Sequence, residues 1–416
     1  MTATLTRWAE QDEAARASAA ARAGEALRSG YLVVVPTETV YGLAASAVSA
    51  AGLDRLREAT GRSLLRGRSG PEMTWHAADV GDVERAVELQ TAVHRRLVAK
   101  LLPGPVRFLI EQSDAGIAGL RERLGVEPGV IEDGRWVAVR IPAHAAARGV
   151  AREAGVPLVA ERLGAAAFAG PVGSGAAVGG WAEGASEEGG DESAGVEGVP
   201  EAVAEIIDDG RLTPGVPSTT VLLRSNGAFE VDSDGALSEA DVLAALERRI
   251  LLVCTGNTCR SPMAEAIGRE LASKRPADGI GYVFESAGVA TGDGLDPSPE
   301  AVGAVEPMGL DLSGHRTRRV TPAMVRRAER IYAMTPSHLD QLVSMMPEAE
   351  GKAELLDPEG SAVDDPIGGS PEVYTEAAES MRGMLEARLR ELDAEPAGRG
   401  AGGSGGRAGV DGRGAG

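Results

Sequence analysis

Two cysteines are the only thiols in this chain of 416 residues, and they bracket a short loop that could hold a phosphate group. Cys254 ends an apolar run, Ile250 to Val253, and Arg260 follows six residues later, where the sequence reads Arg-Ser-Pro. A thiol attacks phosphorus as the thiolate, and N–H groups at a helix N-terminus stabilise that anion. Arginine can hold two phosphate oxygens at once. The spacing predicts Cys254 as a nucleophile and Arg260 as its phosphate-gripping partner.

The rest of the loop consists of residue types that suit a tight phosphate cradle. Gly256 and Asn257 tolerate a left-handed backbone, and Ser261 can donate a hydrogen bond to the thiolate. The expected phosphate- and substrate-binding residues are Thr255, Gly256, Asn257, Thr258, Cys259 and Ser261. A buried cysteine followed by a solvated arginine would give the same bare spacing. The strand before the loop and the helix start after it favour catalysis.

From Val253 to Pro262 the chain reads Val-Cys-Thr-Gly-Asn-Thr-Cys-Arg-Ser-Pro, which resembles the low molecular weight protein tyrosine phosphatase family. The resemblance spans Arg249 to about Leu392 and includes an Asp-Asp-Pro stretch that contains Asp365. It implies that Asp365 protonates the leaving group and then activates water against a phosphocysteine. It implies no metal and no cofactor. The alternative for Asp365 is an exposed turn aspartate.

The residue in the middle of the loop helps to distinguish between possible substrates. Members that act on phosphotyrosine usually carry an aliphatic residue where this chain has Thr258, and the loop resembles the bacterial protein arginine phosphatase subgroup. A hydroxyl there can hydrogen-bond the guanidinium side of phosphoarginine. Ile367 departs from the family's pattern, because an aromatic residue is common directly after the Asp-Pro pair. Phosphoarginine on a protein is the first choice and phosphotyrosine the alternative.

Cys259 has two interpretations. It either forms a protective disulfide with an oxidised Cys254 or is a small packed residue inside the loop. Arsenate reduction on the same fold needs a relay of further cysteines, which this chain does not contain.

A second motif lies near the N-terminus. Residues 36–43 read Pro-Thr-Glu-Thr-Val-Tyr-Gly-Leu, which resembles the opening of the YrdC-like threonylcarbamoyl-AMP synthases of tRNA modification. The resemblance covers about residues 15–248 and implies an open twisted α/β sheet, a nucleotide site and membership of a double-stranded RNA binding family. An active domain would use ATP, threonine and bicarbonate and would serve the tRNA pathway. The candidate ligand-binding residues are Thr37, Arg62, His76, Arg140 and Ser218. His76 is alternatively a satisfied surface residue.

Three departures from the synthase pattern weaken its catalytic site. The family's lysine position reads Thr60, its Ser-Ala-Asn stretch reads Glu-Arg-Leu-Gly from Glu161, and a threonine is replaced by Arg107. A carboxylate at Glu161 would repel the phosphates of ATP. We therefore expect a degenerate domain that binds nucleotide without turning it over. A bifunctional enzyme that also makes threonylcarbamoyl-AMP, and a pure binding module, are the alternatives.

The elements around these motifs predict an α/β fold in two domains. Residues 1–248 form the YrdC-like domain, with a disordered acidic insertion near 170–198, and residues 249–395 form a small doubly wound parallel sheet. Residues 396–416 are a disordered Gly-rich tail. Helices are expected at 8–29, 83–102, 200–208, 238–248 and 371–392.

Composition narrows the possible partners. The formal net charge of −20 argues against sequence-independent binding to nucleic acid or to an anionic membrane. The apolar runs are too short to cross a membrane, and the N-terminus lacks the basic-then-apolar order of a signal peptide. We expect a cytoplasmic protein, no membrane partner, and a phosphorylated protein as substrate.

Overall fold

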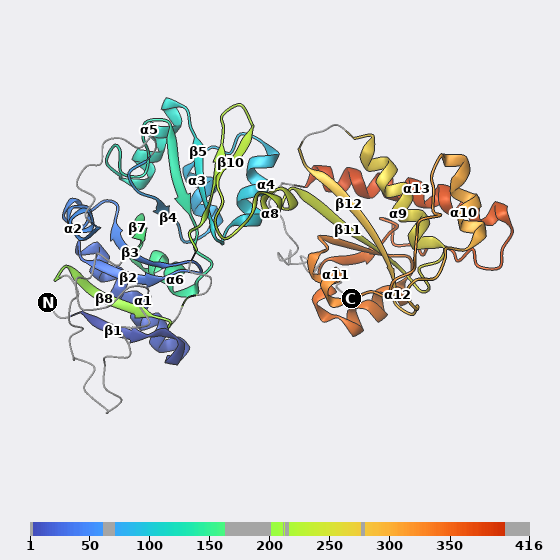
Figure 1. The fold of residues 1–416 in the computed structure, drawn as a ribbon, viewed down its shortest axis with the longest axis horizontal. Helices are drawn as coiled ribbons and strands as arrows, with labels where there is room; N and C mark the ends of the chain where they lie inside the picture. The colour runs from blue at the N-terminus through green and yellow to red at the C-terminus, as the bar shows by residue number, and fades with distance from the viewer. Residues whose placement is uncertain are drawn as a thin grey trace, which may run out of the picture. The chain divides into compact units, whose positions relative to one another are not determined.

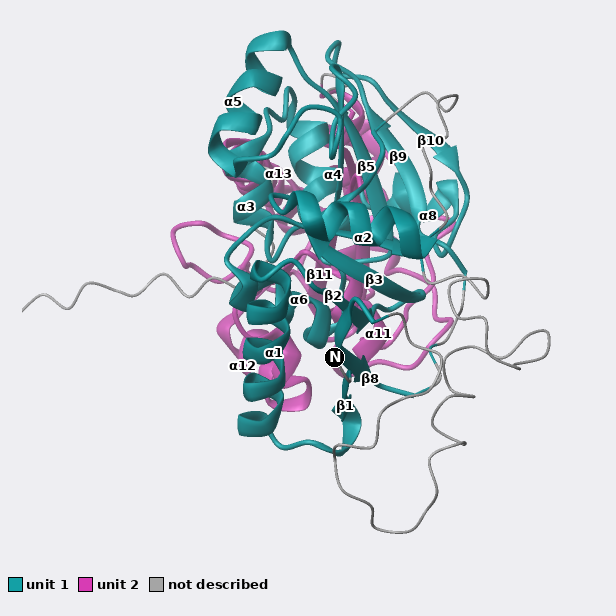
Figure 2. Ribbon diagram, turned by 90° about the vertical axis from the view of Figure 1, so that its left-hand side faces the viewer, with its two compact units in different colours: residues 1–245 teal, residues 246–416 magenta. Residues whose placement is uncertain are grey.

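The computed structural model describes residues 3–60, 71–162, 201–210, 212, 216–275 and 279–395. The chain divides into two compact units, 1–245 and 246–416 (Figures 1 and 2). This division lies just before the one expected from the sequence, which falls after Arg248. Three features named above lie outside the described residues: Arg62, the insertion near 170–198 and the tail 396–416.

Unit 1 is built around a mixed sheet with the strand order β1-β8-β2-β3-β7-β4-β6-β5-β9-β10. Its strands are β1 (Thr4–Arg7), β2 (Leu32–Pro36), β3 (Tyr41–Ser46), β4 (Trp75–His76), β5 (Val106–Glu111), β6 (Trp136–Arg140), β7 (Leu158–Arg162), β8 (Val203–Asp208), β9 (Thr219–Leu223) and β10 (Phe229–Ser233). Its helices are η1 (Trp8–Glu10), α1 (Glu13–Arg28), α2 (Ala50–Thr60), α3 (Val80–Ala86), α4 (Ala92–Leu101), α5 (Asp114–Leu124), α6 (Ala145–Ala154) and α8 (Glu239–Ala244).

The alanine-rich face of α1 lets two helices pack closely on this sheet. Asp12 caps α1 by accepting a hydrogen bond from the Ala15 N–H at 2.8 Å. A side chain at Gly24 would come within 2.8 Å of the backbone of α6, so the two helices meet backbone to backbone there. Ala20, Ala23 and their neighbours join the apolar residues of β2 and β8 in one buried cluster.

Three of the expected helices of unit 1 are wrong in extent or type. The helix expected at 200–208 is strand β8, which pairs in parallel with both β1 and β2. Its Val-Ala-Glu-Ile-Ile-Asp sequence suits a buried strand, and pairing on both sides outweighs local propensity. The helix expected at 83–102 is interrupted between α3 and α4, where Thr91 caps α4. The helix expected at 238–248 ends with α8, because Glu247 already belongs to β11 (Glu247–Cys254).

Unit 2 contains a parallel sheet with the order β12-β11-β13-β14. The first strand of the unit lies inside the sheet and the chain adds strands on both sides of it, which is a doubly wound arrangement. The remaining strands are β12 (Gly281–Gly288), β13 (Arg330–Ala333) and β14 (Ala353–Leu355). The helices are α9 (Arg260–Ser273), α10 (Pro299–Val305), η3 (Glu306–Met308), α11 (Pro322–Arg327), α12 (Pro336–Met345), η4 (Pro347–Ala349) and α13 (Pro371–Ala394).

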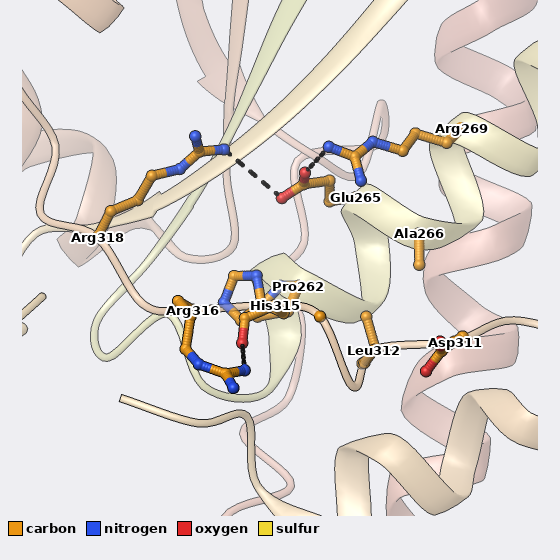
Figure 3. A pocket seen from close by; sticks show the side chains of 10 residues that line it. Pro262, Glu265, Ala266, Arg269, Asp311, Leu312, His315, Arg316 and Arg318 are labelled. Carbon is orange, nitrogen blue, oxygen red and sulfur yellow. Dashed lines mark hydrogen bonds and ion pairs between the residues drawn. The ribbon is translucent and has the colours of Figure 1, made fainter. Parts of the chain in front are cut away.

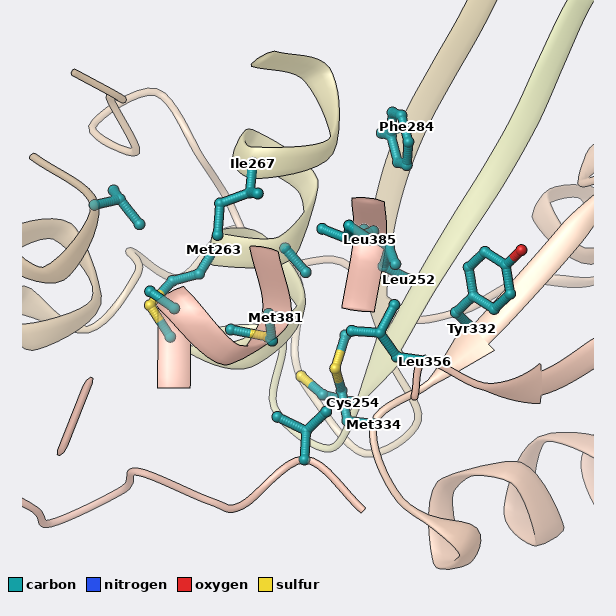
Figure 4. Packing of buried hydrophobic residues seen from close by; sticks show 14 of the residues in the cluster. Leu252, Cys254, Met263, Ile267, Phe284, Tyr332, Met334, Leu356, Met381 and Leu385 are labelled. Carbon is teal, nitrogen blue, oxygen red and sulfur yellow. The ribbon is translucent and has the colours of Figure 1, made fainter. Parts of the chain in front are cut away.

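Alternate residues of β11 are buried on opposite faces of this sheet. Ile250 and Leu252 join the cluster that contains residues of α9, α10 and α13, which Figure 4 shows from close by. Leu251 and Val253 join a second cluster with residues of α11 and α12. Helices therefore cover both faces, which explains why the strand reads as a continuous apolar run. No helix in the described parts of the chain combines the length and apolar character needed to cross a membrane.

Candidate active site

The phosphate loop lies beyond the carboxyl end of β11, where doubly wound sheets bind their ligands. Cys254 is the last residue of β11 and Arg260 is the first residue of α9. The Val289 N–H donates to the Cys254 carbonyl oxygen at 3.0 Å, which ties the start of the loop to the end of β12. A side chain on Gly288 would come within 2.6 Å of the Thr255 carbonyl oxygen, so the loop requires glycine at that position.

The Cys254 sulfur is buried and faces hydrogen-bond donors. Its Sγ lies 3.0 Å from the Ser261 hydroxyl and accepts from the Asn257 N–H at 3.2 Å. The sulfur is thus held between the serine that follows Arg260 and the backbone of the loop, and both cysteines of the chain are free.

Asn257 is the structural centre of the loop. Its φ of 55° lies in the left-handed region, whereas Gly256 has no positive φ, so the expected left-handed backbone applies to Asn257 alone. The Asn257 Nδ2 donates to the Ser261 and Ser286 hydroxyls, both at 2.9 Å. The Arg318 N–H donates to the Asn257 Oδ1 at 2.9 Å. A fully buried amide therefore fixes the strained turn from three sides.

Hydrogen bonds from residues outside the loop extend this network around Asn257. His315 Nε2 lies 2.8 Å from the Asn257 carbonyl oxygen, and the Ser286 hydroxyl donates to Glu265 Oε2 at 2.5 Å. These positions did not enter the predicted site, because their sequence surroundings carry no chemistry of their own. They are neighbours of the loop only once β12 and the segment before α11 are in place.

Arg260 and Asp365 form a direct ion pair. The Arg260 guanidinium is buried and bonds Asp365 Oδ2 at 2.6 Å through one nitrogen and the Val363 carbonyl oxygen at 3.2 Å through another. The Asp365 side chain is about half exposed. The structure therefore brings Cys254, Arg260 and Asp365 to one place, with the carboxylate at the open side.

His338 is a site residue that the sequence analysis missed. Its Nε2 lies 2.7 Å from the Thr255 hydroxyl, and its Nδ1 lies 3.0 Å from the Thr335 hydroxyl. Burial and, to a smaller extent, the positive charge of Arg260 lower the pKa of His338 to about 4, with Asp365 opposing the shift. The imidazole is therefore neutral near pH 7. Its position just beyond the carboxyl end of β13, beside β11, is the signal that could have identified it.

Thr258 and Cys259 form the far side of the loop. The Thr258 carbonyl oxygen accepts from the Ser298 N–H at 3.0 Å, and its side chain is half-buried. Cys259 is buried, with its Sγ 3.2 Å from the Ser298 hydroxyl and 3.7 Å from the Tyr374 hydroxyl. Ile367 is 70% exposed. The thiol of Cys259 is thus packed against polar side chains rather than facing solvent.

In unit 1 the structure brings two of the candidate ligand-binding residues into contact. Arg140 donates to Glu38 Oε1 and to the Thr39 hydroxyl, both at 2.8 Å, and to the Thr37 hydroxyl at 3.4 Å. Glu38 Oε2 accepts in turn from the Ala143 N–H at 2.8 Å. The positive charge of Arg140 is therefore largely matched within the protein.

The other described candidates lie around this group. His76 pairs with Arg140 across β4 and β6, and burial together with the charge of Arg140 lowers the pKa of His76 to about 3. The Ser218 hydroxyl is buried without a hydrogen-bond partner. Glu161 lies on β7 opposite Leu43 of β3. Thr37, His76 and Arg140 share one region, and among the described residues no hydrogen bond of the Ser218 hydroxyl joins it to them.

The comparisons with known proteins match the two units separately. The family model described as low molecular weight phosphotyrosine protein phosphatase matches residues 249–397, and the Sua5/YciO/YrdC model, described as telomere recombination, matches residues 25–162. A protein-arginine-phosphatase of Geobacillus stearothermophilus is 35% identical over 151 residues, which cover 35% of this chain and 97% of that protein. The low molecular weight protein-tyrosine-phosphatase Etp of Escherichia coli (strain K12) is 36% identical over 147 residues, covering 34% and 90%.

Solved structures match the same part of the chain. The YwlE arginine phosphatase from Geobacillus stearothermophilus has 32% sequence identity and a TM-score of 0.32, covering 35% of this chain and 93% of that one. A low molecular weight protein tyrosine phosphatase from T. tengcongensis has 36% identity and a TM-score of 0.33, covering 35% and 99%. By the family models and the curated relatives, the chain belongs to the low molecular weight phosphatase family through its C-terminal unit, and its N-terminal unit carries a YrdC-like domain.

Proposed function

We propose that unit 2 removes phosphate from phosphoarginine in proteins through a phosphocysteine intermediate. The observation that carries the proposal is the position of the Cys254 sulfur, which meets the Ser261 hydroxyl and the Asn257 N–H at the start of α9. The pair of Arg260 with Asp365 adds a phosphate ligand and a proton donor beside it.

In the first step the Cys254 thiolate attacks phosphorus, a sulfur–phosphorus bond forms and the phosphorus–nitrogen bond breaks. Asp365, as the carboxylic acid, gives its proton to the leaving guanidinium nitrogen. In the second step Asp365 takes a proton from water, whose oxygen attacks phosphorus and releases phosphate and the thiolate. Because Arg260 also bonds Asp365, a bound phosphate would compete with this carboxylate for the guanidinium.

Two features favour phosphoarginine over phosphotyrosine. Thr258 supplies a hydroxyl within the loop, and Ile367 is an exposed aliphatic residue next to the Asp365-Pro366 pair. An aliphatic wall suits the methylene chain of arginine, whereas an aryl ring gains more from an aromatic partner. Relatives named for either substrate occur at similar identity, so phosphotyrosine remains the second candidate.

The experiment compares two peptides of the same sequence that carry phosphoarginine or phosphotyrosine at the same position. We expect kcat/KM for the phosphoarginine peptide to be at least about tenfold higher, since losing a hydrogen bond that a site is built to make is costly. Cys254→Ser is the control, and more than about a tenth of the wild-type rate in that variant would reject Cys254 as the nucleophile. A higher kcat/KM for the phosphotyrosine peptide would select the second candidate.

For unit 1 we propose that the domain binds a nucleotide or another small polar ligand but does not synthesise threonylcarbamoyl-AMP. Arg140 is already bonded to Glu38 and Thr39, so less of its charge is available to ATP phosphates. Glu161 adds a carboxylate where the synthases carry a neutral polar stretch. The synthase family has a lysine where this chain has Thr60, so a further cation is missing.

A further inference from the structure

A cavity of about 390 Å³ lies in unit 2 between α9 and the chain segment before α11 (Figure 3). One face of α9 and the stretch 311–318 line it. The lining residues are Pro262, Glu265, Ala266, Arg269, Asp311, Leu312, Gly314, His315, Arg316 and Arg318. Cys254, Arg260 and Asp365 are not among them. The cavity is therefore distinct from the phosphate site.

Three arginines dominate the charge of this cavity. Arg269, Arg316 and Arg318 keep 62%, 54% and 39% of their side chains exposed, so a solute can reach them. The buried Glu265 carboxylate lies between the guanidinium groups of Arg269 and Arg318, as Figure 3 shows. Asp311 is engaged by the N–H and hydroxyl of Ser313, at 2.7 and 2.9 Å. The lining thus has a positive excess in a chain whose formal net charge is −20.

The size and charge of the cavity define the ligand. Small-molecule sites have volumes of roughly 300–1,000 Å³, and this cavity falls at the lower end of that range. Guanidinium groups bind phosphoryl and carboxylate oxygens in preference to other groups. The carboxylate partner of Arg316 is the exposed Asp296 at 3.1 Å, which an anion can displace, and Arg316 also donates to the Ser313 and His315 carbonyl oxygens. We propose that this cavity binds a small di- or trianion with phosphoryl or carboxylate groups, and that the bound anion activates the phosphatase.

The activation follows from hydrogen bonds that join the cavity walls to the phosphate loop. On one wall His315 contacts the Asn257 carbonyl oxygen at 2.8 Å, and the Arg318 N–H donates to the Asn257 side chain at 2.9 Å. On the other wall Glu265 accepts from Ser286, which accepts from Asn257. An anion bound to these walls fixes the groups that hold Asn257 in its left-handed conformation. Because the Asn257 N–H contacts the Cys254 sulfur, this ordering favours the reactive form of the loop.

The binding test uses calorimetric titration of the full-length protein with citrate and, separately, with 3-phosphoglycerate. Each titration is repeated with orthovanadate present, because this phosphate mimic occupies the catalytic loop. We expect binding to one site under both conditions. The affinity should be about tenfold or more lower in the double variant Arg269→Ala/Arg316→Ala. The matched control is Arg326→Ala, another exposed arginine of unit 2 that does not line the cavity. The tighter of the two probes identifies the preferred anionic group.

Three results would overturn the binding proposal: no binding up to about 10 mM of either probe, loss of binding when orthovanadate is added, or equal binding in the double variant. The regulatory part rests on the proposed phosphatase function and is tested by turnover of an aryl phosphate at matched ionic strength. We expect at least a twofold rise in kcat/KM with saturating probe in the wild type and in Arg326→Ala, and none in the double variant. Binding without any change in turnover rejects the coupling. A protein that binds the probe but never hydrolyses phosphate would instead reject the proposed function.

Discussion

Replacing Asn257 by alanine tests whether one buried amide holds the catalytic loop together. The substitution removes three side-chain hydrogen bonds, to Ser261, Ser286 and the Arg318 N–H. The two serine hydroxyls keep their contacts with Cys254 and Glu265, whereas the Arg318 N–H loses its partner. At about 0.5–1.5 kcal/mol each, the lost bonds amount to roughly 1.5–4.5 kcal/mol. Alanine must also adopt a φ near 55°, which costs about 1–2 kcal/mol. Most substitutions cost about 0.5–3 kcal/mol, so this one lies at the upper end.

Asn257→Gly separates the two contributions. It loses the same side-chain bonds but tolerates the left-handed backbone, at an entropic cost of about 0.5–1 kcal/mol in the unfolded chain. We therefore expect the glycine variant to be more stable than the alanine variant by about 1 kcal/mol. Asn226→Ala is the matched control, because Asn226 is the other asparagine of the chain and its side chain accepts one exposed hydrogen bond, from the Ala228 N–H.

Stability is measured by urea unfolding followed by circular dichroism, and the transition of unit 2 is identified by its shift with added phosphate. Activity is measured as kcat/KM for an aryl phosphate. A misplaced loop should lower it by about 10- to 100-fold in Asn257→Ala. If that variant loses less than about 1 kcal/mol of stability, or if the glycine variant is the less stable of the two, the buried amide does not hold the loop in its conformation.

Three further predictions follow from the same geometry. Thr258→Ile should lower kcat/KM for phosphoarginine and raise it for aryl phosphates, and a ratio that stays within about twofold would show that Thr258 does not set specificity. Because the pKa of His338 is lowered to about 4 in the folded protein, stability should decline as pH falls from about 6.5 to 4, by about 1–3 kcal/mol after allowance for solvent screening. Urea unfolding at several pH values measures this slope, and His338→Gln should flatten it; an unchanged slope would contradict the assignment. Full-length protein carrying Cys254→Ser, given ATP, bicarbonate and threonine, should release no threonine-dependent pyrophosphate, and release would show that the synthase site has been rebuilt.

The loop could be predicted from the sequence because its chemistry is local. Cys254 and Arg260 lie six residues apart between a strand and a helix, so their spacing alone places both side chains at one turn. The same holds for the helix α13, whose expected range of 371–392 lies within its observed bounds. Local sequence is sufficient where the neighbours that matter are close along the chain.

The groups that support the loop are distant in sequence and were missed for that reason. His338 contacts Thr255 across 83 residues, and His315 contacts Asn257 across 58. Strand β8 was assigned as a helix because its partners, β1 and β2, lie far away along the chain and only their pairing makes it a strand. In each case tertiary contacts decide the outcome, and propensity over a short window does not contain them.

The phosphate loop and the carboxylate of Asp365 are restrained to different degrees. Asn257 is fixed by buried hydrogen bonds on three sides, and Cys254 lies directly against it. Asp365 instead pairs with Arg260 and keeps about half of its side chain exposed. In the proposed mechanism the position of the nucleophile is therefore fixed by the fold, whereas the position of the acid depends on Arg260, which a phosphate would also bind. The proposal thus makes the carboxylate, rather than the sulfur, the group that substrate binding has to reposition.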